Sequence, residues 1–419
     1  MADWHTTIRE RDFPMLEQAE CDGRALIYLD NAATTQCARP VQWALESYWR
    51  SQHANVYRGA YCLSRRAGEA VEEVRQLCAE FLGAGSGNEI IFTAGATASA
   101  NLLADAFALT ELRSGDLVLA TEMEHHSNLL PWREACRRTG AELALAPVTG
   151  EGELDLEALD RLLERRPKLL AVTAVSNVLG TINPLEEIVS RAHRVGCAVA
   201  VDAAQAMRCA LPGVDVLDCD FLYFSAHKIM GPTGVGVLYG KRAWLEKLTP
   251  PRTGGGMVRA LPGMEPEYED APLKFEAGTL DLAGVAGLGA ALEYLHAVGR
   301  RRIAAREQAL LRYTEKRLRE LPGLRVLGSP RRRAGCVSFT AEPLQPLDVA
   351  MLLDSQGIAV RSGSHCAIPL HARLGLSGSV RVSPAFYNTA EEIDALAAAL
   401  ARVLDSARKG GVLKDKANG

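Results

Sequence analysis

The chain reads Phe221-Leu-Tyr-Phe-Ser-Ala-His-Lys228-Ile-Met-Gly-Pro-Thr-Gly-Val-Gly236 near its middle. An apolar run, a polar turn with Gly and Pro, and a second apolar run predict a strand, a tight turn and another strand. Lys228 is then expected at the end of a buried strand. Its stem either covers the end of the sheet while its ammonium reaches water, or the amine loses its proton through desolvation and becomes a Schiff-base nucleophile.

Strands and helices alternate on both sides of this stretch, from about residue 24 to 240. Apolar segments such as Leu117–Ala120, Leu169–Val175 and Cys197–Val201 are separated by helical patterns. This order predicts an α/β fold with one parallel or mostly parallel sheet and helices on both faces.

The length of 419 residues predicts two domains, because a single core rarely grows so large. We expect a large domain over residues 24–285, a smaller C-terminal α/β domain formed by 1–23 with 286–408, and a polar tail over 409–419. One long helical run over 285–320 links the two, and the Gly- and Pro-rich segment 250–272 is expected to be an irregular crossing or subunit contact.

The composition excludes several classes of protein. Hydrophobic residues make up 48% and charged residues 23%, which is typical of a globular chain. A net charge of -4 gives no reason to expect nucleic acid or an anionic membrane as a partner. The ten cysteines show no CxxC pair and no metal-ligand spacing, so neither a metal site nor a disulfide framework is predicted. With no visible secretory signal and no apolar span of about 18 residues, we expect a cytoplasmic protein.

Several further groups are predicted at the same edge of the sheet as Lys228. The turn Gly95–Thr97 before a helix is an anion site or a simple helix cap. His125 or His126 suits stacking on a flat ring, or metal binding with further ligands, and Asp202 ends an apolar strand. An anion site, a stacking ring, a carboxylate and a desolvated lysine together fit pyridoxal 5'-phosphate (PLP). Asn31, followed by small residues, is either near a ligand or in an Asx turn.

The chain resembles group II (SufS/CsdA-type) cysteine desulfurases, which belong to the class V aminotransferase-like family of fold-type I PLP enzymes. The resemblance runs from Tyr28 to Thr389. Its most specific motifs are Met123-Glu-His-His-Ser-Asn128, Ser176-Asn-Val-Leu-Gly180, Val201-Asp-Ala-Ala-Gln205, Ser225-Ala-His-Lys228, Phe275-Glu-Ala-Gly-Thr279 and Arg361-Ser-Gly-Ser-His-Cys366-Ala-Ile-Pro369.

The resemblance implies a role for each matching residue. Lys228 is the implied Schiff-base lysine, Asp202 the partner of the ring nitrogen, Gln205 that of the phenolic oxygen, and His125 the stacking ring. The implied phosphate ligands are Ala96, Thr97, Ser225 and His227, with Thr279 from the other subunit of a homodimer. Asn177 and Arg381 are implied to hold the substrate carboxylate, Arg361 lines the cysteine loop, and Asn31 is assigned to the substrate site.

The implied reaction converts L-cysteine to L-alanine and leaves a persulfide on Cys366. The Gly, Ser, His and Pro residues around Cys366 predict an exposed loop, where positive charge on Arg361 and His365 is expected to favour the thiolate. A SufE- or SufU-like sulfur acceptor is the implied partner.

The sequence departs from the family pattern near the site. Tyr57 and Tyr61 stand where histidines are usual, Ala96 replaces a threonine, and Leu280 replaces a proline. Two alternatives therefore stay open. One is an enzyme like selenocysteine lyase or cysteine sulfinate desulfinase, which the presence of Cys366 disfavours. The other is a divergent paralogue that serves as a non-catalytic partner, which the retention of Lys228 disfavours.

Overall fold

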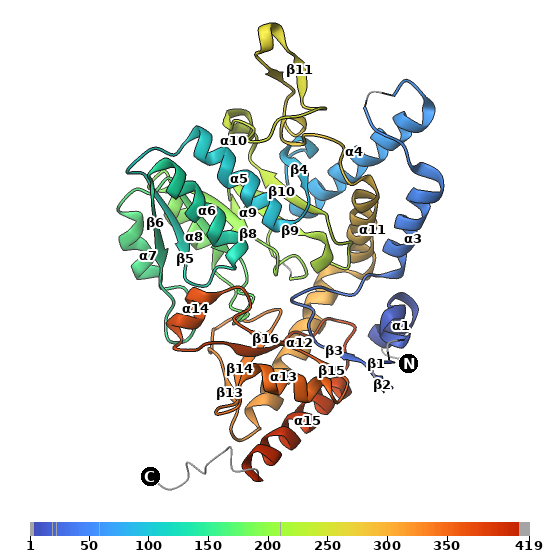
Figure 1. Cartoon of the computed structure of the whole chain (residues 1–419), viewed down its shortest axis with the longest axis vertical. Helices are drawn as coiled ribbons and strands as arrows, with labels where there is room; N and C mark the ends of the chain where they lie inside the picture. Colours follow the sequence, from blue (N-terminus) through green and yellow to red (C-terminus); the bar gives the residue numbers. More distant parts are fainter. Residues whose placement is uncertain (1–3, 19, 22, 58, 210, 410–419) are drawn as a thin grey trace.

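A seven-stranded sheet forms the centre of the computed structural model, which describes residues 4–409 apart from 19, 22, 58 and 210 (Figure 1). Its strand order is β4-β10-β9-β8-β7-β5-β6. Only β10 runs antiparallel to its neighbours, β4 and β9, so the prediction of a mostly parallel sheet is confirmed. The strands are β4 (Ile90–Thr93), β5 (Leu117–Thr121), β6 (Glu142–Ala146), β7 (Leu169–Thr173), β8 (Ala198–Asp202), β9 (Phe221–Ser225) and β10 (Gly236–Gly240).

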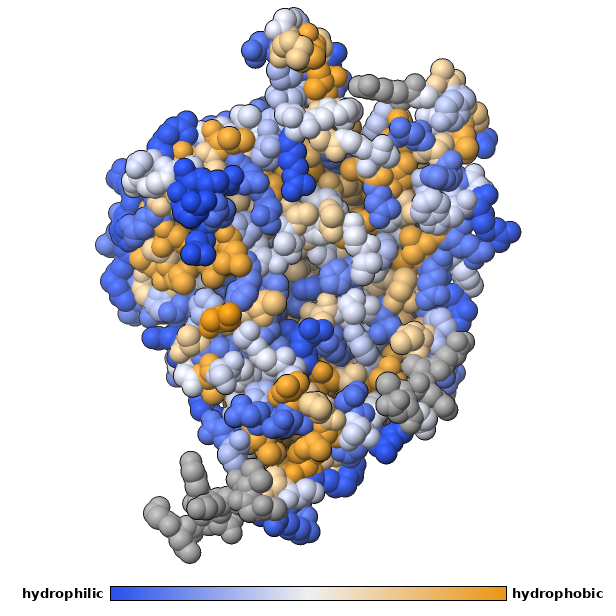
Figure 2. Space-filling model, in the orientation of Figure 1, coloured by the Kyte–Doolittle hydropathy of each residue, from blue (hydrophilic) through white to orange (hydrophobic). Residues whose placement is uncertain are grey.

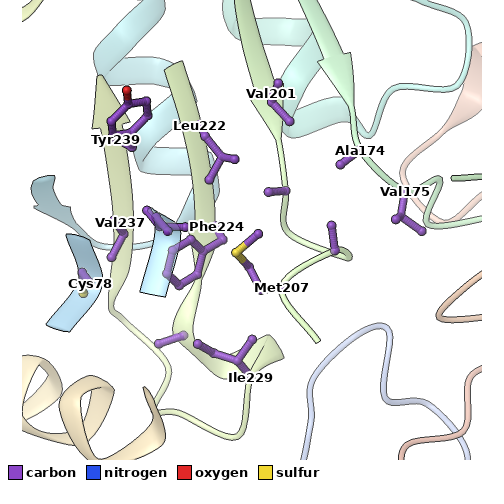
Figure 3. Close-up of a cluster of buried hydrophobic side chains, with 14 of the residues drawn as sticks. Cys78, Ala174, Val175, Val201, Met207, Leu222, Phe224, Ile229, Val237 and Tyr239 are labelled. Carbon is purple, nitrogen blue, oxygen red and sulfur yellow. The ribbon is translucent and has the colours of Figure 1, made fainter. Parts of the chain in front are cut away.

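Helices cover both faces of this sheet because successive strand residues point to opposite sides. Leu222 and Phe224 belong to the core of one face (Figure 3). Phe221 and Tyr223 belong to the core of the other face. The helices of the large sheet region are α3 (Arg39–Ser47), α4 (Cys62–Leu82), α5 (Ala96–Thr110), α6 (His126–Thr139), α7 (Leu156–Leu163), α8 (Leu185–His193), α9 (Val214–Leu217), α10 (Arg242–Lys247) and α11 (Leu282–Val298).

A four-stranded antiparallel sheet lies below the large one in Figure 1, with the order β13-β14-β17-β16. Phe339, Val382 and Leu400 belong to its separate core. Its elements are β13 (Arg325–Val326), β14 (Val337–Thr340), β16 (Arg361–Gly363), β17 (Ser379–Val382), α12 (Arg300–Arg319), α13 (Pro346–Asp354), α14 (Ile368–Arg373) and α15 (Ala390–Lys409). In Figure 2 an apolar area gathers towards this end, and Leu347, Met351 and Leu352 of α13 are exposed.

The N-terminal segment is built into this smaller region. β3 (Ile27–Tyr28) pairs in parallel with β15 (Ile358–Ala359), and Asp30 forms a bridge to Ser383. Before β3 come α1 (Trp4–Asp12), α2 (Pro14–Gln18), β1 (Glu20–Cys21) and β2 (Arg24–Ala25).

The run 285–320 is not the one long helix that was predicted, since α11 and α12 are separated at Gly299, whose φ is 95°, and bend by 78°. The segment 250–272 is not irregular throughout, because β11 (Val258–Ala260) and β12 (Glu267–Tyr268) form a projecting hairpin (Figure 1). Its alternative role as a subunit contact stays a prediction. Among the described helices, no single one is long and apolar enough to cross a membrane, and α11 with α12 passes that test only as a bent pair. Of the predicted tail, residues 410–419 lie outside the described residues.

The stretch around Lys228 forms the predicted strand, turn and strand. β9 ends at Ser225, a 3-10 turn spans Ala226–Lys228, and β10 begins at Gly236. A Cβ added at Gly236 would lie 2.4 Å from the Cα of Gly95. Only glycine therefore lets β10 approach the turn before α5, and this contact places that turn beside the end of β9.

Candidate active site

A cavity of about 320 Å³ opens at the carboxyl ends of β7, β8 and β9. It brings together most of the predicted site residues from both sheets. These are Ala96, Thr97, His125, Asn177, Asp202, Gln205, Ser225, His227, Lys228, Arg361, Cys366 and Arg381. The carboxyl edge of parallel strands is where α/β proteins bind ligands, so the position agrees with the chemistry of the lining.

Lys228 is held in the turn after β9 with its amine near this cavity. Burial and the positive charges of Arg381, Arg208 and Arg361 lower the pKa of Lys228 to about 8, and only Asp202 acts in the opposite direction. No hydrogen bond or ion pair to Nζ is found in the described part of the chain. An unpaired amine of lowered pKa is a competent nucleophile near neutral pH.

Asp202 and His125 present two different chemical groups to the cavity. Asp202 ends β8, its Oδ1 accepts a hydrogen bond of 2.9 Å from the backbone N–H of Ala204, and burial raises its pKa. His125 caps α6, and its Nδ1 accepts a hydrogen bond from the Ser127 N–H at 3.1 Å. This bond leaves the proton on Nε2, and burial lowers the pKa of His125 to about 4, so the ring is neutral at pH 7. Gln205 donates from Nε2 to the Ala32 carbonyl at 2.7 Å.

The turn before α5 has the features of an anion site. Gly95 has a φ of 139°, and α5 begins at Ala96 without a side-chain cap. The Ala96 N–H donates to Ser225 Oγ at 2.8 Å, and Thr97 Oγ1 lies 2.7 Å from Ser127 Oγ. The positive end of the helix dipole therefore faces a cleft of about 440 Å³ that His227 and Arg252 also line.

Arg381 and Arg361 reach the cavity from the smaller sheet, and Asp30 joins them. Arg381 Nη2 donates to Asp30 Oδ1 at 3.2 Å, and Arg361 Nη2 lies 2.8 Å from Asp30 Oδ2. Arg381 Nη1 donates to the Asn177 carbonyl at 2.9 Å, but its buried Nε has no hydrogen-bond partner within the described residues. A buried N–H without a partner is costly, so this atom suits an anionic ligand such as a carboxylate.

Asp30 is a functional residue that was not predicted from the sequence. Its position just after the short strand β3 was a visible sign of a possible site residue. However, Asp30 comes close to the two arginines only because β3 pairs with β15 in the smaller region. Asn31, next in the chain, does not line the cavity. Its Nδ2 donates to the Ser383 carbonyl at 2.8 Å, and its Oδ1 accepts the Tyr387 hydroxyl, so the amide is occupied by protein groups.

Cys366 lies in the loop between β16 and α14, exposed at the edge of the cavity. His365 and Cys366 both adopt left-handed backbone conformations, with φ values of 51° and 56°. Two hydrogen bonds fasten these strained residues, one of 2.7 Å from Asn177 Nδ2 to the His365 carbonyl and one of 2.7 Å from the His126 N–H to the Cys366 carbonyl. Left-handed residues cost about 1–2 kcal/mol each, so the loop is held by its neighbours.

The expectation that charge on His365 favours the thiolate is wrong. Burial, with the nearby charges of Arg381 and Arg361, lowers the pKa of His365 to about 2. The ring is therefore neutral, and its Nε2 lies 3.0 Å from Ser379 Oγ. Positive charge near Cys366 comes from the arginines instead.

The remaining predicted residues lie away from the cavity. Thr279 is exposed between the turn Leu273–Phe275 and α11, so its role from a partner subunit stays a prediction. Tyr57 and Tyr61 line a separate cleft of about 480 Å³ and are exposed. Their departures from the family pattern therefore do not alter the cavity lining of this chain.

An uncapped helix N-terminus, a neutral imidazole, a buried carboxylate and an unpaired lysine all face one space. This set matches the phosphate, ring face, ring nitrogen and aldehyde of PLP, so the residues present fit that cofactor. The arginine with an unpaired N–H adds a place for an amino-acid carboxylate.

Comparison with known proteins agrees with this geometry. The family model "Aminotransferase class-V" matches residues 27–396. A probable cysteine desulfurase of Halalkalibacterium halodurans is 44% identical over 388 residues, which is 93% of this chain and 95% of the relative. A cysteine desulfurase of Synechococcus elongatus is 42% identical over 94% of this chain, and the chain spans 63% of that longer relative. The crystal structure of the cysteine desulfurase CsdA from Escherichia coli superimposes with a TM-score of 0.88 at 35% identity, covering 97% of this chain and 100% of CsdA.

Proposed function

The chain belongs to the class-V aminotransferase family, and on this basis we propose that it converts L-cysteine to L-alanine and transfers the sulfur to Cys366. It is a cysteine desulfurase and uses PLP. The observation that best supports the residue assignment is that Lys228 and Cys366, which come from different sheets, line one cavity with the unpaired Nε of Arg381.

We assign the cofactor contacts from the lining of the cavity. Lys228 would form the Schiff base, Asp202 would meet the ring nitrogen, His125 would stack on the ring and Gln205 would reach the phenolic oxygen. The phosphate would lie against Ala96, Thr97, Ser225 and His227, with Thr279 of the partner subunit in a homodimer. When bound, PLP withdraws electrons from the α-carbon of an attached amino acid.

The residues of the chain then have separate tasks. The Arg381 Nε–H, together with Asn177 in the same cavity, would bind the substrate carboxylate and orient the cysteine. The neutral amine of Lys228 would accept the α-proton at Nζ. The Cys366 thiolate would attack the substrate sulfur, so that an S–S bond forms as the C–S bond breaks, and the electron pair stays with the substrate carbon. Protonation of that carbon, with return of the α-proton from Lys228 Nζ to the α-carbon, would give alanine, and Cys366 would keep the sulfur as a persulfide.

A neighbouring arginine places a fixed positive charge in the cavity. Arg361 lines the same cavity as Cys366, and Asp30 holds its guanidinium in place at 2.8 Å. Because Arg361 is half-exposed, this charge is partly screened by water.

The test is to give L-cysteine to the purified holoenzyme and to measure alanine, and sulfide released by a reductant. The variant Cys366→Ala is compared with Cys62→Ala, because Cys62 is also an exposed cysteine but lies outside the cavity. We expect Cys366→Ala to keep the colour of bound PLP and to lose transferable sulfur, whereas Cys62→Ala behaves like the wild type. Equal sulfide yields from the two variants would contradict the persulfide assignment.

We further propose a sulfur acceptor protein of the SufE or SufU type. Cys366 and the nearby Ile368 are both exposed, so a persulfide at this position is open to a second protein. We also propose that the chain forms a homodimer, and that it has a large domain over 24–285 and a smaller domain made of 1–23 and 286–408. We propose a cytoplasmic location as well, since a thiol that forms a persulfide needs a reducing compartment.

A further inference from the structure

A buried hydrogen-bond network centred on Glu124 lies directly behind the cavity. Glu124 Oε1 accepts from Thr121 Oγ1 at 2.6 Å and from the Thr173 N–H at 3.0 Å, and Oε2 accepts from Asn128 Nδ2 at 2.6 Å. The Tyr223 hydroxyl donates in turn to Asn128 Oδ1. All five residues are buried, and none has a task in the reaction proposed above.

The network contains the neighbours of Asp202 on both sides. In the sheet register Thr173 of β7 pairs with Asp202, and Asp202 pairs with Tyr223 of β9. Residues that pair directly across strands point to the same face of a sheet. Asp202 therefore lies between two residues that Glu124 connects, Thr173 directly and Tyr223 through Asn128.

The same carboxylate also holds the segment that carries His125. Thr121 ends β5 and Asn128 lies in the first turn of α6, and both donate to Glu124, which immediately precedes His125. Hydrogen bonds from both ends of the segment 121–128 thus meet at the buried carboxyl group of Glu124. Glu124 links the loop of His125 to the strands on either side of Asp202.

We propose that Glu124 is a positioning residue that fixes His125 and Asp202 relative to each other, and so sets the width and tilt of the cofactor site. The inference rests on the proposed function, because that function gives these two residues the face and the nitrogen edge of the PLP ring. Three donors point at Glu124 and oppose the effect of burial, which raises the pKa of this carboxyl group to about 8. A glutamine at this position has nearly the same shape, but its amide nitrogen would direct two donor hydrogens at groups that are themselves donors. Glu124→Gln therefore disturbs the hydrogen-bond network without changing the size of the side chain.

The test compares Glu124→Gln with Asp220→Asn. Asp220 is a matched control because it is also a buried carboxylate with several donors, including the Val199 N–H at 2.8 Å and Trp244 Nε1 at 3.0 Å. Asp220 lies just before β9, so it is at the end of the sheet opposite to the cavity. Each holoenzyme is dialysed against decreasing PLP concentrations to obtain the dissociation constant, and its circular dichroism is recorded in the absorption band of the bound cofactor.

We expect both variants to lower the melting temperature. Only Glu124→Gln should weaken PLP binding by about ten-fold or more and change the circular dichroism of the bound ring. An unchanged dissociation constant and spectrum in Glu124→Gln, or equal changes in Asp220→Asn, would overturn the proposal. If Glu124→Gln does not fold, Tyr223→Phe decides in the same way, since it removes one hydroxyl of the network and leaves the ring in place. Failure of the proposed function is a separate result, namely a wild type that binds PLP but makes no alanine.

Discussion

Asp30→Asn removes the charge that holds both arginines of the cavity. Arg381, 3% exposed, pairs with a carboxylate that is itself 13% exposed, and breaking such a buried pair costs about 3–5 kcal/mol. Arg361 is 48% exposed, so its ion pair with Asp30 contributes only about 0–1 kcal/mol to stability. The asparagine oxygen keeps one acceptor, which recovers about 1 kcal/mol. We therefore expect the free energy of unfolding to fall by about 3 kcal/mol.

Urea unfolding of the holoenzyme and steady-state kinetics with L-cysteine measure the two consequences. Because Arg381 loses its fixed orientation towards the substrate carboxylate, we expect KM to rise by roughly ten-fold, with a smaller change in kcat. The control is Asp160→Asn, which removes one ion-pair partner of Arg191 at the surface. Because Asp160 is 44% exposed, this substitution should lower the free energy of unfolding by less than about 1 kcal/mol. If Asp30→Asn matches this control in stability and leaves KM unchanged, the reasoning about the arginine pair is refuted.

Cys366→Gly should be more stable to urea than Cys366→Ala by about 1 kcal/mol, since both remove the thiol but only glycine relieves a φ of 56°; equal stabilities would show that the loop is not strained. Without PLP, Lys228→Met should be more stable than the wild type at pH 7 by up to about 3 kcal/mol, because the folded protein holds the pKa of Lys228 at about 8, below its usual 10.5. The folded wild type binds this proton less tightly than the unfolded chain does, so the stability advantage of Lys228→Met should fade as pH rises from 8 to 10.5. An advantage that does not depend on pH would show that the lowered pKa of Lys228 is not its cause. Gly236→Ala should lower stability by about 1–3 kcal/mol and weaken PLP binding in dialysis, because its Cβ would lie 2.4 Å from Gly95 Cα; wild-type affinity would show that the turn before α5 can move freely.

The carboxyl edge of the large sheet was predictable because each of its groups follows a strand along the chain. Asp202 ends one apolar run, Lys228 and His125 follow others within a short turn, and parallel strands end at the same edge. Nothing more than alternation of strands and helices was needed to bring them together.

The arginine side of the cavity was not predictable from local patterns. Asp30 meets Arg361 and Arg381 only because strands more than 300 residues apart pair, and no periodicity encodes that choice. The neutral state of His365 depends on burial beside two arginines, which is likewise a property of the folded chain. The break at Gly299 was hidden because apolar residues continue with helical spacing on both sides of the glycine.

The pairing of β3 with β15 also fixes when, during synthesis, the enzyme can become active. Residues 27–28 leave the ribosome early, but their strand partners 358–359 follow roughly 20–70 s later at about 5–20 residues per second. All seven strands of the large sheet have been synthesised once residue 240 has been added. A nascent chain can therefore form the edge that bears Lys228 and Asp202 well before it contains Arg361, Cys366 or Arg381. Translation itself then delays sulfur chemistry until about the last seventh of the chain has been made.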